Sequence, residues 1–222
     1  MTLRLHFHPF SSFCQKVLVA LYERDVPFEP VLVDLSDQQQ LEALEALWPM
    51  AKFPVLQDEA AGITLAESSV IVEYLDRFGD APPLMPQDQD EALKSRLWDR
   101  VFDNYVEVPL QKAVSDCFRP AGKCDPQGVE DAKRILVRAY GLIDAELGRS
   151  GTPWIAGDSF SLADCGAAPA LFYANMVVPF AGRPTLNAYY QRLRARPSFS
   201  RAVDEARTYR GFFPLPWPEG HD

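Results

Sequence analysis

Long apolar runs are missing from this chain of 222 residues, and its N-terminus lacks the pattern of a secretory signal. No stretch approaches the roughly 20 apolar residues that a membrane-spanning helix needs. Cysteine is scarce as well, and none of the four shows CxxC spacing: Cys14, Cys117, Cys124 and Cys165. Without an export signal we expect these thiols to stay reduced. The sequence therefore predicts a cytoplasmic protein that does not enter a membrane.

Positive charge is in deficit, because 22 Lys and Arg stand against 31 Asp and Glu, a net charge of −9. Nonspecific binding to nucleic acid is therefore not expected. The deficit is local: residues 1–80 hold 5 basic and 13 acidic side chains, whereas residues 81–222 hold 17 and 18. This change in character supports a domain boundary near Pro82 and Pro83. If an anionic ligand docks on the acidic part, amide donors and Lys52 must outweigh the local field.

Histidine is also rare. His6 and His8 share one face of a predicted strand, and the third histidine is His221 in the tail. Two ligands are too few for a closed metal site, so the sequence predicts no metal.

The most informative stretch runs from Lys52 to Leu75. Two short apolar runs, beginning at Phe53 and Ile63, flank a turn at Gly62, and a helix follows at Glu67 or Ser68. If the Phe53–Pro54 bond is cis, the backbone of Phe53 faces outward and can pair with an extended peptide. The helix start offers free N–H groups to a carboxylate. The stretch thus indicates either a site for a small acidic peptide or a plain hairpin followed by a helix that Ser68 caps.

The rest of the first part alternates strands and helices. Leu3 to Phe7 has strand alternation, and a helix follows Ser11 and Ser12. A second strand is predicted within residues 28–35, and a short helix within residues 37–47. With the hairpin and its helix, the order β-α-β-α-β-β-α predicts a small α/β sandwich of the thioredoxin type over residues 1–80.

Residues 81–88 are proline-rich and are predicted to link this domain to an all-helical domain over residues 89–222. Apolar residues indicate a helix from Glu91 to about Leu110, with a kink before Pro109: Leu93, Leu97, Val101, Tyr105 and Val108. Later helices are expected after Asp125, Ser161, Arg183 and Arg196. Ser161 and Asp164 have capping-box spacing. The apolar tail, residues 212–217, is expected to cover a core edge rather than the cleft between the domains.

The run Phe53-Pro54-Val55-Leu56, followed by Glu67-Ser68, resembles the glutathione-binding half of the soluble glutathione S-transferase family, and the likeness spans roughly residues 3–208. The block from Gly157 to Asp164 is similar to a folding motif of that family's helical domain. The resemblance implies a cis Pro54, backbone contacts from Phe53 to the cysteinyl unit of glutathione, and Glu67 and Ser68 on its γ-glutamyl end.

The same resemblance implies a basic or amide side chain on the glycyl carboxylate of glutathione, for which the candidates are Lys52 and three glutamines: Gln38, Gln39 and Gln40. The family more often shows Asn-Pro-x-Gly-Lys before the cis proline, whereas this chain has Trp-Pro-Met-Ala-Lys at residues 48–52. The loss of the glycine, replaced here by Ala51, suggests a different loop shape.

Members of the family hold glutathione as a thiolate, which a hydrogen-bond donor and a helix N-terminus both favour. The first strand has no tyrosine for this role. The pattern Ser-x-Phe-x-x-Lys-Val resembles the serine-type members, with Ser11 as the donor and Ser12 as its rival. Cys14 is a further candidate, as the thiol of a glutathione-dependent reductase. However, cysteine-type members carry their cysteine at the position of Ser11, and we expect Cys14 in the core.

The sequence is thus identified as a glutathione S-transferase-like detoxification enzyme that adds the glutathione thiolate to a small apolar electrophile. The electrophile is expected between the domains, with Trp98, Asn104 and Tyr105 as possible walls, and the family usually forms homodimers. Three alternatives stay open: a thiol reductase, a noncatalytic binding protein of the same fold, and a maleylacetoacetate isomerase. The last is suggested by the similarity of residues 47–50 and of Ser11-Ser12 to zeta-type members.

Overall fold

A computed structural model describes residues 3–218 of the chain. Its sheet contains β1 (Leu3–Phe7), β2 (Glu29–Leu32), β3 (Val55–Asp58) and β4 (Ile63–Ala66), in the order β2-β1-β3-β4. β1 runs parallel to β2 and antiparallel to β3, which pairs antiparallel with β4. The alternation predicted for β1 is present: Leu3, Leu5 and Phe7 are buried, and the residues between them are half-buried.

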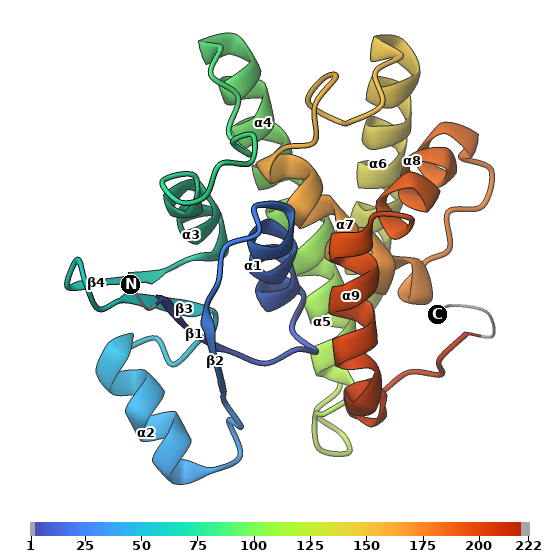
Figure 1. The fold of residues 1–222 in the computed structure, drawn as a ribbon. Helices are drawn as coiled ribbons and strands as arrows, with labels where there is room; N and C mark the ends of the chain where they lie inside the picture. The colour runs from blue at the N-terminus through green and yellow to red at the C-terminus, as the bar shows by residue number, and fades with distance from the viewer. Residues whose placement is uncertain (1–2, 219–222) are drawn as a thin grey trace.

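Helices cover both faces of this sheet (Figure 1). α1 (Ser12–Glu23) and α3 (Ser68–Leu75) lie on one face, and α2 (Gln38–Leu47) lies on the other. α2 contributes Leu44 to a small separate core with Val33 and Val55, whereas α1 joins the main core. The predicted thioredoxin-like arrangement of the first part is confirmed.

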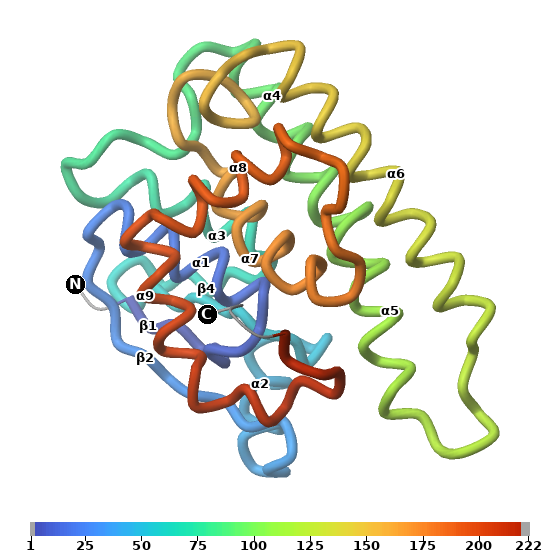
Figure 2. Tube along the Cα trace, turned by 90° about the vertical axis from the view of Figure 1, so that its right-hand side faces the viewer, coloured from blue at the N-terminus to red at the C-terminus, as the bar shows by residue number. Residues whose placement is uncertain are grey.

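The remainder of the described chain is helical. It contains α4 (Gln89–Phe102), a π-helical turn η1 (Asp103–Glu107), α5 (Val108–Asp116), α6 (Pro126–Ser150), α7 (Leu162–Val177), α8 (Pro184–Arg194), α9 (Pro197–Ala206) and a 3-10 segment η2 (Arg207–Phe212). α7 is buried from Leu162 to Ala174 and packs against both α1 and α4. α9 returns to the first part and packs along α1 (Figure 2). Of the described helices, none combines the length and the apolar content that crossing a bilayer requires.

The helix ends confirm several sequence signals. Asp125 caps α6 and Pro126 takes its first position, as the missing N–H of proline permits. α6 ends at Gly151, whose φ of 66° is a left-handed conformation that glycine adopts readily. The capping box of α7 is formed by Ser161 and Asp164.

Two predicted elements differ in the structure. The second strand is shorter than residues 28–35, because a turn that is closed by a hydrogen bond from the Asp37 N–H to the Asp34 carbonyl follows it. The helix expected from Glu91 to Leu110 is interrupted by the π turn η1, just before the predicted kink at Pro109. Pro109 itself lies in the first turn of α5, where proline is tolerated. The division into residues 1–80, 81–88 and 89–222 stays a prediction.

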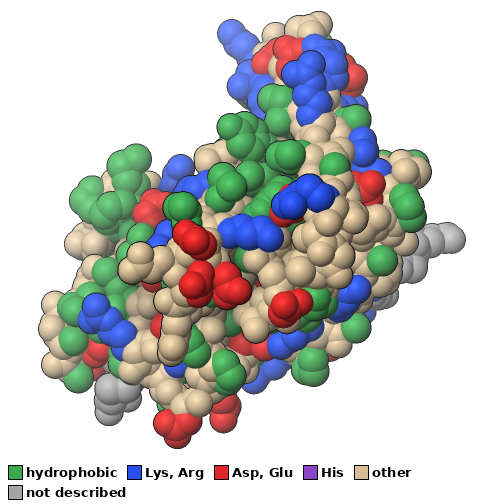
Figure 3. Space-filling model, turned by 90° about the horizontal axis from the view of Figure 1, so that it is seen from above, with side chains coloured by type: hydrophobic (Ala, Val, Ile, Leu, Met, Phe, Trp, Pro, Cys, Tyr) green, Lys and Arg blue, Asp and Glu red, His purple; other side chains and the backbone are tan. Residues whose placement is uncertain are grey.

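The apolar repeat of α4 to α5 lies mostly outside the core. Val101 is buried, but the other four residues of the repeat are more than half exposed: Leu93, Leu97, Tyr105 and Val108. Figure 3 shows hydrophobic side chains gathered between basic and acidic clusters on the face seen from above. Exposed apolar residues on one helical face indicate a contact surface rather than a solvated one.

Candidate active site

The sheet topology gathers the predicted site residues at one edge. β1 is antiparallel to β3 and β3 to β4, so the end of β1 meets the start of β3 and the end of β4. Ser11 follows β1, Phe53 precedes β3, and Glu67 follows β4 directly. The register pairs Val55 with Ala66, which sets Phe53 and Pro54 beside Glu67. Three segments that are far apart in sequence therefore border one site (Figure 1).

The Phe53–Pro54 bond is cis, as the sequence resemblance implies. Phe53 lies outside the ladder, which begins at Val55, and Pro54 is buried. The Phe53 ring stacks with His8, with ring centroids 6.2 Å apart. Burial lowers the pKa of His8, although the negative charge of Asp34 opposes this shift. His8 therefore packs as a neutral ring against the ring of Phe53.

The start of α3 has an unusual backbone. Glu67 occupies the N-cap position with φ 67° and ψ 112°, and it gives no side-chain cap to the described helix. Such conformations cost about 1–3 kcal/mol for a residue other than glycine and cluster at ligand sites. The Glu67 side chain is exposed, whereas Ser68, the first residue of α3, is buried. The first N–H groups of α3 are thus left without a side-chain acceptor from Glu67.

The loop before Pro54 has a left-handed residue at the position where the family pattern has glycine. Ala51 replaces the glycine of the family pattern, and a different loop shape was expected from that change. Ala51 has φ 51°, the left-handed conformation that glycine adopts at little cost. Ala51 therefore adopts a conformation typical of glycine, and this costs about 1–2 kcal/mol of conformational free energy. Lys52 follows it and is exposed.

The glutamines of α2 lie in its first turn. The N–H groups of Gln39 and Gln40 donate to the side chain of Asp37, the cap of the helix. The Gln40 side chain accepts a hydrogen bond from the Asp34 N–H, and the Gln38 amide donates to Glu42. Of the three glutamines, Gln39 is the one whose side-chain amide makes no hydrogen bond within residues 3–218, so its role as a glutathione ligand stays a prediction.

Ser11 and Ser12 differ in how their hydroxyl groups are used. Ser11 is the N-cap of α1, and its Oγ accepts the N–H of Cys14 at 3.4 Å. An accepting hydroxyl keeps its own hydrogen for another partner. Ser12 donates its hydrogen to Oε2 of Glu107 at 2.9 Å. The Ser12 hydroxyl is thus engaged by a carboxyl group, whereas that of Ser11 is not, and the role of Ser11 as the donor to sulfur stays a prediction.

Cys14 lies in the core, as expected. It is completely buried, and this burial raises the pKa of its thiol to about 12. A thiol of that kind is protonated at neutral pH and is a poor nucleophile. The structure therefore gives no support to a reductase that uses Cys14.

A cleft of about 220 Å³ opens beside the two serines. Its walls come from three parts of the chain: residues 10–12, the end of η1 with α5, and residues 212–214, together with Tyr173 of α7. The walls suggested by sequence are wrong in detail, because Trp98 is buried and Asn104 and Tyr105 do not line the cleft. The wall residues lie further along the chain, in α5, at Leu110, Gln111 and Val114.

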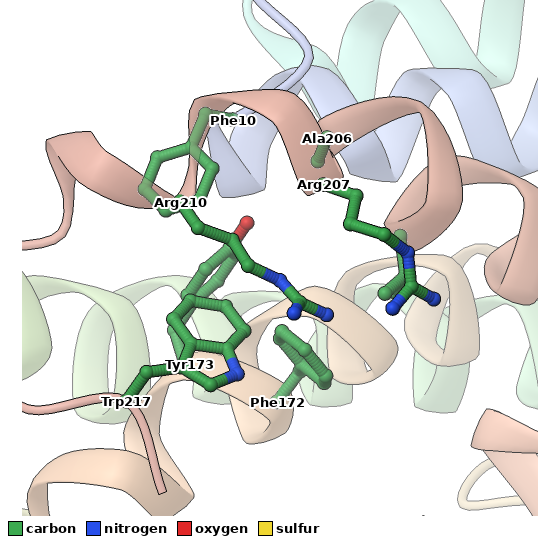
Figure 4. A pocket seen from close by; sticks show the side chains of 8 residues that line it. Phe10, Phe172, Tyr173, Ala206, Arg207, Arg210 and Trp217 are labelled. Carbon is green, nitrogen blue, oxygen red and sulfur yellow. The ribbon is translucent and has the colours of Figure 1, made fainter. Parts of the chain in front are cut away.

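The apolar tail occupies both of the places that were considered for it. Phe212 and Phe213 line the cleft, so the expectation that the tail avoids it is wrong. Trp217 covers a core edge, where its ring packs against Phe10 and Phe172 (Figure 4). The guanidinium of Arg210 lies over this indole at 4.8 Å from its centroid. The tail thus joins the core edge to the cleft.

A buried charged network lies beneath the start of α3. Lys16 of α1 is 1% exposed, and its Nζ contacts carboxylates of both Asp99 and Asp103 and the hydroxyl of Ser69 at 2.9 Å. Arg100 adds a second cation to the same carboxylates. Burial opposes ionisation of Asp99, but the charge and hydrogen bond of Lys16 prevail and lower its pKa. The network ties α1 and α3 to α4 and η1.

The two histidines in the described part of the chain have other neighbours than a metal ligand set. His6 bonds to Gln57 at 2.7 Å, His8 packs among aromatic rings, and His221 lies outside residues 3–218. Within those residues, no three His, Cys, Asp or Glu side chains are arranged to hold an ion.

Known proteins resemble the chain over both parts. Residues 5–83 match the model of the glutathione S-transferase N-terminal domain, and residues 126–192 match that of the C-terminal domain. A glutathione S-transferase of Pseudomonas putida is 31% identical over 210 residues, which cover 90% of this chain and 91% of the relative. The chain belongs to the glutathione S-transferase family.

Other glutathione S-transferases support the assignment. One from Silene vulgaris is 28% identical over 214 residues, covering 91% of this chain and 97% of the relative. The solved structure of a glutathione S-transferase from Methylobacillus flagellatus, with glutathione bound, has a TM-score of 0.81 and 29% identity; the match covers 90% of this chain and 98% of that one. The serine-type or zeta-like subtype stays a prediction.

One residue of the cleft was missed by the sequence reading. Glu107 lies in the wall beside Ser12, 95 residues away in the chain. A signal was present, since a glutamate interrupts the apolar run around Val106 and Val108. Periodicity did not single it out because the π turn shifts the helical faces at this point.

Proposed function

We propose that this glutathione S-transferase binds glutathione at the sheet edge and adds its thiolate to a small apolar electrophile in the cleft. The observation that carries the proposal is the meeting of Ser11, Phe53 and the start of α3 at one edge, beside a cleft. The backbone of Phe53 lies outside the ladder and serves the cysteinyl unit. Glu67 binds the α-amino group, and Ser68 with the first N–H groups of α3 binds the γ-glutamyl carboxylate.

The other end of glutathione meets the loop before Pro54 and the first turn of α2. Lys52 is exposed there, and it is the cation that precedes the cis bond by one residue. Gln39 offers a side-chain amide from the exposed start of α2. Together they bind the glycyl carboxylate, and Lys52 offsets part of the acidic field of residues 1–80.

Ser11 holds the sulfur as a thiolate. A free thiol has a pKa near 8.5, so most of it is protonated at pH 7. The Ser11 hydroxyl donates to the sulfur while it accepts the Cys14 N–H, and the start of α1 adds its positive end. Both interactions favour the anion and lower the thiol pKa. The apolar walls at Leu110, Val114 and Phe213 select an apolar second substrate.

Glutathione binding and conjugation test this proposal directly. We expect the wild type to be retained on immobilised glutathione and to conjugate a nitro-activated aryl chloride. Glu67→Lys should weaken glutathione binding by at least tenfold in calorimetry, because it replaces the partner of the α-amino group with a like charge. Glu59→Lys makes the same change in net charge on the hairpin turn and should leave binding unaltered. Retention without conjugation would favour the noncatalytic alternative.

We also propose that the enzyme is a homodimer formed through α3 and α4. Arg96 of α4 pairs with Glu73 of α3 at 2.9 Å. Val70 is three residues from Glu73 and Leu93 is three residues from Arg96, so the ion pair joins the helical faces that carry these two exposed apolar residues. Leu97, 58% exposed, continues the same surface. Burying this surface against a second copy removes apolar side chains of both parts of the chain from water.

Light scattering on the eluting protein tests the dimer. We expect a mass of twice 24.9 kDa for the wild type, and the monomer mass for Leu93→Lys/Leu97→Lys, because two desolvated ammonium groups oppose association. Phe118→Lys alters an equally exposed side chain beyond α5 and should leave the dimer intact. A monomeric wild type, or a double lysine variant that remains a dimer, would exclude the proposed interface.

The proposal includes a role in detoxification within the cytoplasm. All four cysteines are free, which supports a reducing compartment. Among the relatives is a probable maleylacetoacetate isomerase 2 of Drosophila melanogaster, 26% identical over 196 residues. Assay of a cis-alkene diacid with glutathione decides whether isomerisation accompanies transfer.

A further inference from the structure

Glu107 is a buried acid in the wall of the cleft that the proposed transfer does not use. It is the last residue of the π turn η1 and is 3% exposed. Within residues 3–218 it forms no ion pair, and its hydrogen-bond partner is the hydroxyl of Ser12. π turns add one residue to a helix and recur at functional sites. Burying a carboxyl group without an ion-pair partner costs free energy. Its presence in the wall of a substrate cleft therefore indicates a function.

The surroundings of Glu107 favour a neutral carboxyl group. Burial raises the pKa of Glu107 to about 8, although the hydrogen bond from Ser12 acts to lower it. The negative charge of Asp103 on the same turn raises the pKa further, and Lys16 of α1 opposes this. From α7, Tyr173 presents a hydroxyl whose own pKa is raised by burial. At pH 7 Glu107 is therefore mainly protonated and has a hydrogen to donate.

The cleft brings this acid and the thiolate site to the same substrate. Ser11, Ser12 and Glu107 all line it, together with apolar side chains such as Leu110 and Val114. An electrophile placed in this cleft beside Ser11 is therefore also bordered by the side chain of Glu107. Displacement of halide from an aromatic ring has no use for that proton. Addition across a conjugated double bond does, because a carbanion forms beside the carbonyl group.

We propose that Glu107 is the catalytic acid for addition of glutathione to α,β-unsaturated carbonyl compounds, which makes these the preferred substrate class. This inference rests on the proposed glutathione transfer. The thiolate forms a carbon–sulfur bond at the β-carbon, and the π electrons move to the carbonyl oxygen as an enolate. The Glu107 carboxyl gives its proton to the α-carbon and becomes a carboxylate. The S–H of the next glutathione returns a proton to Glu107, so that one glutathione has added to one acceptor.

Glu107→Gln is the decisive variant because it keeps the volume of the side chain and a hydrogen-bond acceptor for Ser12. We expect kcat for an α,β-unsaturated ketone to fall about 100-fold, in the range that general acid catalysis contributes. The kcat for a nitro-activated aryl chloride should change less than about threefold. In the wild type the ketone rate should decline above pH 8, as the acid form of Glu107 is lost, whereas Glu107→Gln should show no such decline.

The control and the outcomes separate this inference from the proposed function. Glu130→Gln removes an exposed acid of α6, outside the cleft residues, and should retain both rates. Equal losses with both electrophiles in Glu107→Gln, or no loss with either, would overturn the role of Glu107 while transfer itself stands. A wild type that neither binds glutathione nor reacts with the aryl chloride would overturn both.

A second readout uses the wild type alone and does not depend on the folding of a variant. When the addition is run in D₂O, Glu107 should place deuterium on one face of the α-carbon, because a fixed acid approaches from one side. Proton NMR of the early product distinguishes the two faces. Equal deuteration of both faces would mean that solvent protonates the enolate, and the acid role of Glu107 would be excluded.

Discussion

Replacing Ser11 with alanine should lower kcat/KM for the aryl chloride on the order of 100-fold, because the bound sulfur loses its fixed donor. The pKa of bound glutathione should rise toward that of the free thiol, about 8.5. The activity of Ser11→Ala should therefore recover as the pH is raised toward 9, whereas the wild type should already have reached its plateau. Stopped-flow absorbance of the thiolate in the binary complex measures this pKa without the electrophile.

Ser11 also caps α1, so the effect on sulfur must be separated from an effect on the helix. Losing an N-cap serine to alanine costs about 1 kcal/mol, whereas glycine at the same place costs a few tenths. Ser11→Gly should therefore keep the stability of the wild type and still show the loss of rate. Cys14→Ala should retain the rate, since that thiol is completely buried and takes no part in the proposed transfer. If Ser12→Ala proves the more damaging of the serine variants, the assignment of the donor is wrong.

The sequence was most informative where local chemistry fixes the backbone. Caps at Asp125 and Ser161 and the glycine after α6 each favour a particular conformation, and the structure has it in every case. The same local reasoning located Ser11 at a helix start. These features are set by residues within a few positions of each other, so they need no knowledge of the tertiary fold.

The sequence was least informative where distant segments decide the outcome. Glu107 meets Ser12 across 95 residues, and no local pattern records that contact. The repeat that includes Leu93 and Leu97 predicted a helix but not that these side chains are exposed, because an apolar period does not record what covers the apolar face. The position of the tail that begins at Phe212 could not be predicted either, because its apolar side chains fit both the cleft and a core edge.

Replacing Lys16 with methionine should destabilise the fold by about 3–5 kcal/mol, which is the range for removing one partner of a buried ion pair. The variant leaves Asp99 and Asp103 buried side by side, and the half-exposed Arg100 is the cation that remains with them. We therefore expect the lower part of that range. Urea denaturation at pH 7 measures the loss, and Lys133→Met on the surface of α6 should change stability by less than about 0.5 kcal/mol.

The pH dependence identifies the cause of that loss. Without Lys16 the pKa values of the two carboxyl groups rise in the folded state, so the folded protein binds more protons than the unfolded chain above about pH 4. The deficit relative to the wild type should therefore shrink as the pH falls from 7 toward 4. Lys16→Met/Asp103→Asn should recover at least half of the loss at pH 7, because one buried charge is gone. A deficit that is constant with pH and unchanged by Asp103→Asn would instead mean that Lys16 stabilises through its apolar stem.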